Sequence, residues 1–415
     1  MSTALTLVFA VPLPGHGSSL PATSAGLKSA LGLRPMALTE MGREADRPVL
    51  AILSDDGELH ARVSQLAARC GLKMIPGAIT PIRSTSLVTG SLVSGPRPGF
   101  EKLFEVLGAS GVAGEGDLAR TGDSALRGVP LSRPLACGSF TLRPSSLSAG
   151  GRPLVMGILN VTPDSFSDGG RYAGVDAALA RGIEMAAQGA DLLDVGGEST
   201  RPGSAGISPD EECGRVIPVI EALAKKVSVP ISIDTTKAEV ARRAVQAGAV
   251  IVNDISGMTM DPMMPALVAS LGVPVILNHI RGVPKTMQES PAFDHVVLEV
   301  LLELAARVKA ARQAGVALSK IVVDPGIGFG KNPGDNLALI RHLGVFRSLG
   351  CFVLAGVSRK SFLGASTGRP VAERLAATLA AEVIAAAAGA EILRTHEPRE
   401  TIDALKLAQA LSAAS

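Results

Sequence analysis

The chain has 415 residues, of which 47% are hydrophobic and 3% are aromatic, and its formal net charge is +2. This length favours one large domain with a smaller unit, and the hydrophobic content allows a sizeable core. The near-neutral charge argues against nucleic acid or a membrane surface as a partner. Because aromatic residues are scarce, the core must consist of aliphatic side chains, which is typical of parallel strands buried on both faces.

Residues 1–134 carry weak structural signals. Strands are predicted at 5–11 and 48–54, and helices at 58–70 and 98–107, with segments rich in Gly, Pro, Ser and Thr between them. No nucleotide-binding, metal-binding or catalytic motif occurs in this region. We therefore expect an N-terminal extension that is either a small α/β unit or disordered.

From residue 151 onward, short aliphatic segments alternate eight times with longer helical patterns. The predicted strands cover 154–160, 191–196, 230–234, 250–255, 274–279, 321–325, 351–357 and 391–395. The helical patterns cover 175–188, 209–227, 237–247, 262–270, 294–314, 336–349, 370–388 and 398–411. Eight such units in about 260 residues predict a closed (β/α)8 TIM barrel. An open doubly wound sheet would need a glycine-rich phosphate loop after its first strand, and Asn160-Val161-Thr162-Pro163 is not one.

The barrel domain is expected at 135–415, after an extension at 1–134. Residues 137–142 precede the first barrel strand, and we expect them to form a short strand at the bottom of the barrel. Within the barrel, Ser208 is followed by a proline and by Glu211 three residues after it, which predicts a capped helix start.

The cysteines and the start of the chain indicate the compartment. Cys70, Cys137, Cys213 and Cys351 lie far apart and lack CxxC spacing, so neither a zinc site nor a disulfide framework is indicated. The apolar segment near the start has no basic residue before it, as a signal peptide would require. A reducing cytoplasm is therefore the expected location.

Polar residues stand at the carboxyl ends of nearly all the predicted strands, where an aliphatic barrel has no structural need for them. They are Asn160, Asp194, Asp234, Asn253, Asp254, Asn278, His279, Asp324, Lys360, Arg394 and His396. In a barrel these ends converge on the face that holds active sites. Each residue alone could cap a helix or bind loop amides. Together they indicate a ligand, because buried polar groups destabilise a fold unless they are paired.

The residue types suggest two kinds of ligand group. Asn253, Asp324 and Lys360 offer donors and acceptors for a flat heterocycle with amino, N–H and carbonyl groups on one edge. Arginine side chains such as Arg201 and Arg394 bind phosphate oxygens through two hydrogen bonds. No Cys or Ser in these motifs stands beside a His as a nucleophile would. The site is therefore expected to hold a planar ring and to release a phosphate-type group.

Several of these segments resemble the signatures of dihydropteroate synthases. Residues 157–170 read GILNVTPDSFSDGG and residues 194–203 read DVGGESTRPG. Five further motifs follow in the order of the family, at 232–235, 252–255, 324–331, 358–361 and 394–396. The resemblance covers about 137–412 and implies a transferase of folate biosynthesis. Such an enzyme joins 6-hydroxymethyl-7,8-dihydropterin diphosphate to p-aminobenzoate, giving 7,8-dihydropteroate and pyrophosphate.

The resemblance also implies a role for each site residue. Pterin ligands would be Asp234, Asn253, Asp324, Lys360 and Ile280, and the catalytic residues among them would be Asp234, Asp324 and Lys360. The diphosphate would bind Asn160, Arg201, Arg394 and His396, with Mg²⁺ as cofactor on Asn160. The p-aminobenzoate pocket would contain Phe166, Thr200, Pro202, Phe329 and Ser361, beside Lys360. A homodimer is expected on the same ground.

The motif of the fifth strand departs from the family pattern. Where the family commonly has Met-His-Met-Gln-Gly, this chain has Asn278-His279-Ile280-Arg281-Gly282. Ile280 in place of methionine conserves apolar volume, a change that usually costs little. Whether the Asn278 amide finds a partner is left open by the sequence.

Two alternatives share much of this pattern. A pterin-binding barrel of the corrinoid-dependent methyltransferase type would keep the pterin ligands, but it has no need of both the 162–167 loop and an anion cluster. A paralogue that binds pterin without catalysis would have nearly the same signatures. Retention of every anion-site residue favours the enzyme.

Overall fold

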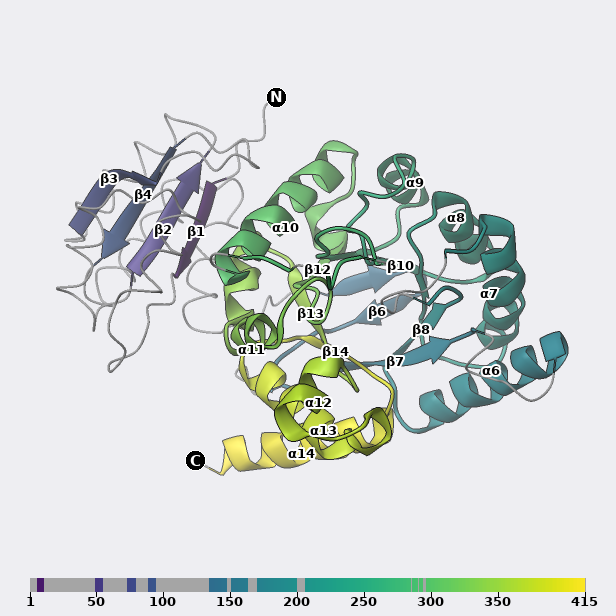
Figure 1. Ribbon diagram of the computed structural model, residues 1–415. Coiled ribbons are helices and arrows are strands. Elements are labelled where there is room, and N and C mark those ends of the chain that lie inside the picture. Colours follow the sequence, from purple (N-terminus) through teal and green to yellow (C-terminus); the bar gives the residue numbers. More distant parts are fainter. Residues whose placement is uncertain are drawn as a thin grey trace. The chain divides into compact units, whose positions relative to one another are not determined.

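The structure is a computed structural model that describes residues 6–10, 49–54, 73–79, 89–94, 134–147, 151–162, 170–199, 206–284, 286–289, 291–293 and 296–414. The chain divides into two compact units, and each is described by itself. One contains a four-stranded sheet and the other a closed barrel (Figure 1). The domain border at 134/135 stays a prediction.

The small sheet is antiparallel and has the strand order β1-β2-β4-β3. Its strands are β1 (Thr6–Ala10), β2 (Val49–Ser54), β3 (Lys73–Ile79) and β4 (Thr89–Ser94). The first two confirm predicted strands, whereas β3 and β4 were not predicted. Pro76 and Gly77 disfavour a strand within β3, and the pairing register with β4 shifts there. The helices predicted at 58–70 and 98–107 lie outside the described residues.

The barrel consists of parallel strands that close in the order β7 to β14, and this confirms the predicted fold. The strands are β7 (Leu154–Asn160), β8 (Leu192–Gly196), β9 (Ile231–Asp234), β10 (Ile251–Asp254), β11 (Val275–Asn278), β12 (Ile321–Asp324), β13 (Phe352–Gly356) and β14 (Ile392–Thr395). Every strand lies within one residue of its predicted bounds. β8, β12 and β13 are buried along their whole length, as aliphatic strands between two apolar layers should be.

Helices surround the barrel strands (Figure 1). They are α6 (Gly170–Ala187), α7 (Pro209–Ala224), α8 (Ala238–Ala247), α9 (Met264–Leu271), α10 (Val296–Gln313), α11 (Pro333–Arg341), α12 (Ser361–Thr367), α13 (Leu375–Ala387) and α14 (Pro398–Ala413). The short helix α12, which follows β13, was not predicted. The helix predicted at 336–349 includes Leu343–Leu349, which forms a 3-10 helix. No helix in the described ranges is long and apolar enough to cross a membrane.

The bottom of the barrel is closed by a hairpin instead of the single strand that was predicted. β5 (Leu135–Cys137) pairs with β6 (Phe140–Leu142), and Gly138 has a φ of 58° at the turn between them. Leu135, Cys137 and Leu142 are buried in one apolar cluster with the first residues of the barrel strands. The closed apolar end leaves the carboxyl ends of the strands as the polar face.

A buried carboxyl group lies between α13, α14 and the end of β14. Glu382 on α13 is 1% exposed, and its Oε2 accepts a hydrogen bond from Thr401 Oγ1 on α14 at 2.7 Å. Thr401 Oγ1 is also 3.2 Å from Thr395 Oγ1 at the end of β14. Burial raises the pKa of Glu382 to about 7, although the threonine hydroxyls act to lower it.

This carboxyl group should make stability fall as the pH rises. Between the ordinary pKa of a glutamate and about 7, the folded protein keeps a proton that the unfolded chain releases. Each pH unit in that window therefore costs up to about 1.4 kcal/mol. Glu382→Gln should reduce this slope, to which the raised pKa values of Asp234 and Asp324 also contribute, measured by urea unfolding at pH 5, 6 and 7. The exposed Glu373→Gln variant is the control, and an equal slope in wild type and Glu382→Gln would contradict the assignment.

Candidate active site

The polar strand ends lie level with one another at the upper rim of the barrel. Parallel pairing aligns Gly196 with both Asn160 and Asp234, and it aligns Asp234 with Asn253. Farther round, Asn278 is aligned with Asp324. The barrel therefore places the predicted polar ends of β7, β9, β10, β11 and β12 on one face, as the sequence indicated.

Asp194, near the end of β8, is the centre of the first polar network. Its Oδ2 accepts hydrogen bonds from Asn253 Nδ2 at 2.9 Å and from Arg394 Nε at 2.6 Å. Arg394 also donates from Nη2 to Asp234 Oδ2 at 2.8 Å. Asp194 is fully buried, and Asn253 is 3% exposed. The Arg394 guanidinium group thus contacts both Asp194 and Asp234. The Asp194 carboxylate in turn contacts both Arg394 and Asn253.

Burial sets the charge state of this network. It raises the pKa of Asp234 to about 7; Arg394 opposes this rise, and Asp194 adds to it. Burial acts to lower the pKa of Arg394, but Asp194 and Asp234 raise it by more. Arg394 therefore stays charged, while Asp234 exchanges its proton near neutral pH.

Asp324, at the end of β12, is the centre of the second network. Its Oδ1 accepts from the Gly326 amide at 2.7 Å, and its Oδ2 accepts from Asn278 Nδ2 at 3.1 Å. Burial raises the pKa of Asp324, and the nearby Lys360 opposes the rise. The Asn278 amide, whose partner the sequence left open, is therefore part of this network.

Lys360 lies just beyond β13 in the same region. Its Nζ donates to the Ile327 carbonyl and lies 4.6 Å from the centroid of the Phe329 ring. Burial lowers its pKa to about 8, and Asp324 opposes that shift. Lys360 thus keeps a positive charge beside an aromatic face, an arrangement that favours the cation.

Three buried oxygens of these two networks lack a partner among the described residues. They are Asp194 Oδ1, Asn253 Oδ1 and Asn278 Oδ1. An unsatisfied acceptor costs about 1–3 kcal/mol, and nearly all buried polar atoms in proteins have a partner. The face is therefore suited to a ligand that donates several N–H hydrogen bonds.

Neighbouring residues on one strand have different roles. Asn253 belongs to the Asp194 network, but Asp254 Oδ1 accepts from the amide and hydroxyl of Ser256, both at 2.7 Å. Successive side chains of a strand point to opposite faces, so Asp254 stabilises the following turn. In the same way His279 is buried against Lys331, whose Nζ is 3.0 Å from its Nδ1.

The predicted anion-binding residues lie at three places on the rim. His396 Nδ1 is 2.9 Å from Ser358 Oγ, which in turn donates to Glu397 at 3.2 Å. A β-carbon placed on Gly196 would lie 3.8 Å from Asn160 Oδ1 and 3.7 Å from Asp234 Oδ2, so these two oxygens flank the same spot. Arg201 lies outside the described residues.

Of the remaining predicted ligands, Ile280 is buried and Ser361 is exposed at the start of α12. Phe166, Thr200 and Pro202 lie outside the described residues. The ligand roles of all these residues stay predictions.

Comparisons with known proteins identify the family. A family model described as pterin binding enzyme matches residues 156–396. The dihydropteroate synthase of Escherichia coli K12 is 46% identical over 280 residues, which cover 68% of this chain and 92% of that protein. The solved structure of Xanthomonas albilineans dihydropteroate synthase with 4-aminobenzoic acid has 46% sequence identity and a TM-score of 0.63, covering 68% of this chain and 99% of the other. The chain belongs to the dihydropteroate synthase family.

Other members agree with this placement. The dihydropteroate synthase of Bacillus subtilis is 45% identical over 279 residues, covering 67% of this chain and 89% of that protein. A second Xanthomonas albilineans structure, in complex with 7,8-dihydropteroate, has 43% identity and a TM-score of 0.60 over 68% of this chain and 99% of the other. These relatives favour a dihydropteroate synthase over the methyltransferase-type barrel.

Asp194 is the residue whose importance the sequence did not reveal. It was visible as a polar strand end inside the second family signature, but nothing assigned it a partner. Its contacts with Asn253 and Arg394 span 59 and 200 residues of the chain. Only the closed barrel brings these three side chains together.

Neutralising Asp194 should therefore change the acidity of Asp234. The negative charge of Asp194 raises the Asp234 pKa, so Asp194→Asn should move that pKa below about 7 and leave Arg394 paired with Asp234 alone. Carbon-13 NMR of labelled aspartate carboxyls measures the shift. Asp210→Asn, at a side chain that is 95% exposed on α7, is the control. An unchanged or higher Asp234 pKa in Asp194→Asn would disprove the coupling.

Proposed function

We propose a division of roles among these residues in the reaction of the family. The chain condenses 6-hydroxymethyl-7,8-dihydropterin diphosphate with p-aminobenzoate and releases pyrophosphate. The observation that carries the proposal is the set of partnerless buried acceptors beside the Asp194–Arg394–Asp234 network. The free acceptors suit N–H donors of a ligand, and the positive charge of Arg394 suits an anion.

The pterin ring would bind through complementary hydrogen bonds. Its amino and ring N–H groups donate, and Asn253 and Asp324 offer acceptors of the matching kind. Lys360 offers a donor for a ring nitrogen or carbonyl. A carboxylate has about four lone-pair positions, so Asp324 can accept from the ring while it keeps its contacts with Gly326 and Asn278.

The bond between the pterin methylene carbon and the diphosphate oxygen breaks in the reaction, and its electron pair leaves with pyrophosphate. The dihydropterin ring stabilises the carbocation that remains, and ionised Asp234 adds an anion near it. The neutral amine of p-aminobenzoate then forms the C–N bond and loses a proton. No strong base is required, so the protein contributes mainly by positioning and by electrostatic stabilisation.

Arg394 and His396 would bind the leaving group. Arg394 is held by two carboxylates, and the diphosphate would take up part of its hydrogen-bonding capacity, because a guanidinium has five N–H donors. Ser358 would orient the His396 ring through its contact with Nδ1. Charge on the departing oxygens is thereby stabilised by groups that are already in place.

Asn160 fits the predicted Mg²⁺ site. Mg²⁺ commonly binds through one or two protein oxygens together with phosphate oxygens and water. Asn160 Oδ1 and the Asp234 carboxylate flank the same spot on the rim. When bound, Mg²⁺ would neutralise charge on the diphosphate.

The aryl ring of p-aminobenzoate would pack against Phe329, with Lys360 at its side. Ser361 follows Lys360 at the same rim. Contacts with Phe166, Thr200 and Pro202, a homodimeric assembly and a cytoplasmic location remain predictions.

Pyrophosphate release with both substrates present tests the function directly. Asp324→Asn and Asp234→Asn should each lower kcat at least 100-fold, about 2.7 kcal/mol of transition-state stabilisation. The exposed Asp403→Asn variant should match the wild type. Absence of release from the wild type would support the alternative of a pterin-binding protein without catalysis.

Calorimetry can test whether Arg394 binds the diphosphate and not the pterin ring. Arg394→Ala should weaken binding of the pterin diphosphate by about tenfold or more, since an arginine–phosphate hydrogen bond pair is lost. Binding of a pterin without diphosphate should change much less. Arg312→Ala, at an exposed side chain in the last turn of α10, is a control. Equal weakening of both ligands would refute the assignment.

A further inference from the structure

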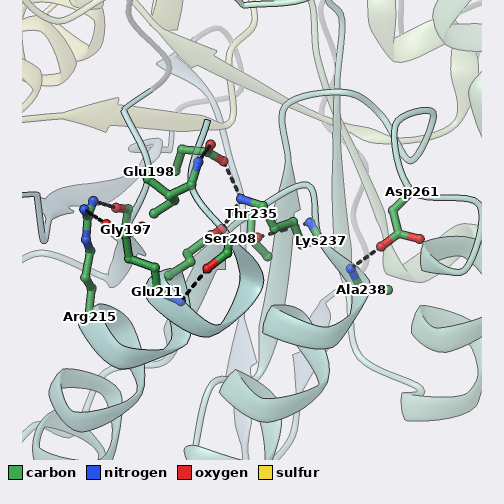
Figure 2. A network of polar contacts seen from close by, with 11 residues as sticks. Gly197, Glu198, Ser208, Glu211, Arg215, Thr235, Lys237, Ala238 and Asp261 are labelled. Atoms are coloured by element: carbon green, nitrogen blue, oxygen red, sulfur yellow. Dashed lines mark hydrogen bonds and ion pairs between the residues drawn. The ribbon is translucent and has the colours of Figure 1, made fainter. Parts of the chain in front are cut away.

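A cluster of charged residues outside the proposed ligand set lies at the base of the segment that joins β8 to α7 (Figure 2). Glu198 follows β8 by two residues, and its Oε1 accepts a hydrogen bond from the Ile207 amide at 3.0 Å. One side chain thus links the two ends of the intervening segment. We name Glu198, Ile207, Lys237 and Glu212 the clasp.

Lys237 connects the clasp to the neighbouring strand and helix. Its Nζ donates to Glu198 Oε2 at 2.6 Å and to Glu212 Oε2 at 2.5 Å. Glu212 lies on α7 and is fully buried, whereas the side chains of Lys237 and Glu198 are 20% and 23% exposed. The clasp therefore joins the end of β8, the start of α7 and the residues after β9.

Two further contacts hold the same segment (Figure 2). Arg215 on α7 donates to the Gly197 carbonyl at 2.8 Å and to Glu211 at 2.6 Å. Ser208 Oγ accepts from the Glu211 amide at 3.2 Å and caps α7, as the sequence predicted. Both ends of the segment are thus fixed to one helix.

Burying three charged groups lowers the stability of a fold unless their geometry is good. Apolar residues of similar volume often give the same or greater stability. The location of the clasp suggests another reason for it. Lys237 lies three residues after Asp234, and its amide donates to Thr235 Oγ1 at 3.2 Å. Between Glu198 and Ile207 the chain carries Thr200, Arg201 and Pro202, which are predicted to contact substrates.

We propose that Glu198 and Lys237 are positioning residues, which fix the two ends of the 199–206 segment relative to Asp234 so that p-aminobenzoate binds productively. The inference rests on the proposed function, because it uses the predicted roles of Thr200 and Pro202. It assigns no substrate contact to the clasp itself. Its loss should therefore raise the KM for p-aminobenzoate more than it lowers kcat.

Steady-state kinetics of Glu198→Ala and Glu198→Gln test the proposal. Glu198→Ala removes both contacts and should raise the KM for p-aminobenzoate about tenfold, with kcat within about threefold. Glu198→Gln keeps an acceptor for the Ile207 amide and should give an intermediate KM. Glu373→Gln, which removes an exposed ion pair with Arg369 outside the clasp, is the control and should keep the wild-type KM.

General destabilisation would give a different result. It would lower kcat through a smaller folded fraction and leave KM unchanged, and that outcome would overturn the proposal. If Glu198→Ala does not fold, Glu198→Gln decides: a KM within 1.5-fold of the wild type, on the order of 0.2 kcal/mol, would equally overturn it.

Hydrogen exchange gives a readout that does not depend on activity. The Ile207 amide should exchange faster in Glu198→Ala than in the wild type and in Glu373→Gln, and equal exchange would contradict the clasp. If the wild type releases no pyrophosphate, the proposed function fails, while exchange at Ile207 still reports on the clasp.

Discussion

The pairing of Arg394 with Asp194 and Asp234 is the interaction on which the rest of the site depends. Two buried carboxylates so close together would repel each other, and one of them would be protonated. Arg394 binds both carboxylates, and it holds the Asp234 pKa to about 7 in surroundings that would raise it further. Asn253, Asp194, Arg394 and Asp234 thus form one continuous chain of hydrogen bonds.

This arrangement is stable because the barrel separates apolar and polar groups along the length of each strand. The first residues of the strands form one cluster with Leu135, Cys137 and Leu142 of the hairpin, and the cluster is almost fully buried. Polar residues begin in the last one to three positions of the strands. A fold with a large apolar core can tolerate a few unsatisfied acceptors such as Asn253 Oδ1.

The sequence predicted the barrel well because its signals are local. Each strand is an aliphatic segment bounded by glycine, proline or a polar residue, and the strand bounds agree within one residue. Local signals failed where the pattern was short or mixed, as in β3 with Pro76, in the seven-residue α12 and in the hairpin. Burial alone could not separate Asn253 from Asp254, because both are buried and only the alternation of side chains along the strand directs Asn253 to Asp194 and Asp254 to the following turn.

Contacts between distant residues could not be predicted, since they depend on how the closed barrel aligns its strands. The Asp194–Arg394 pair and the clasp are both of this kind. In each, a side chain of ordinary local appearance gains its role from a partner on another strand or helix. Motif recognition found the residues of the family signatures, but it did not show which of them contact one another.

Asn278 shows how such a contact changes the site of this particular chain. The family commonly has methionine there, a side chain with a weak acceptor and no donor. Here the amide donates to Asp324 Oδ2 at 3.1 Å and leaves its own oxygen without a partner among the described residues. The amide restricts the orientation of the Asp324 carboxylate and adds one more acceptor beside it. This chain is therefore more polar at the end of β11 than the family pattern provides.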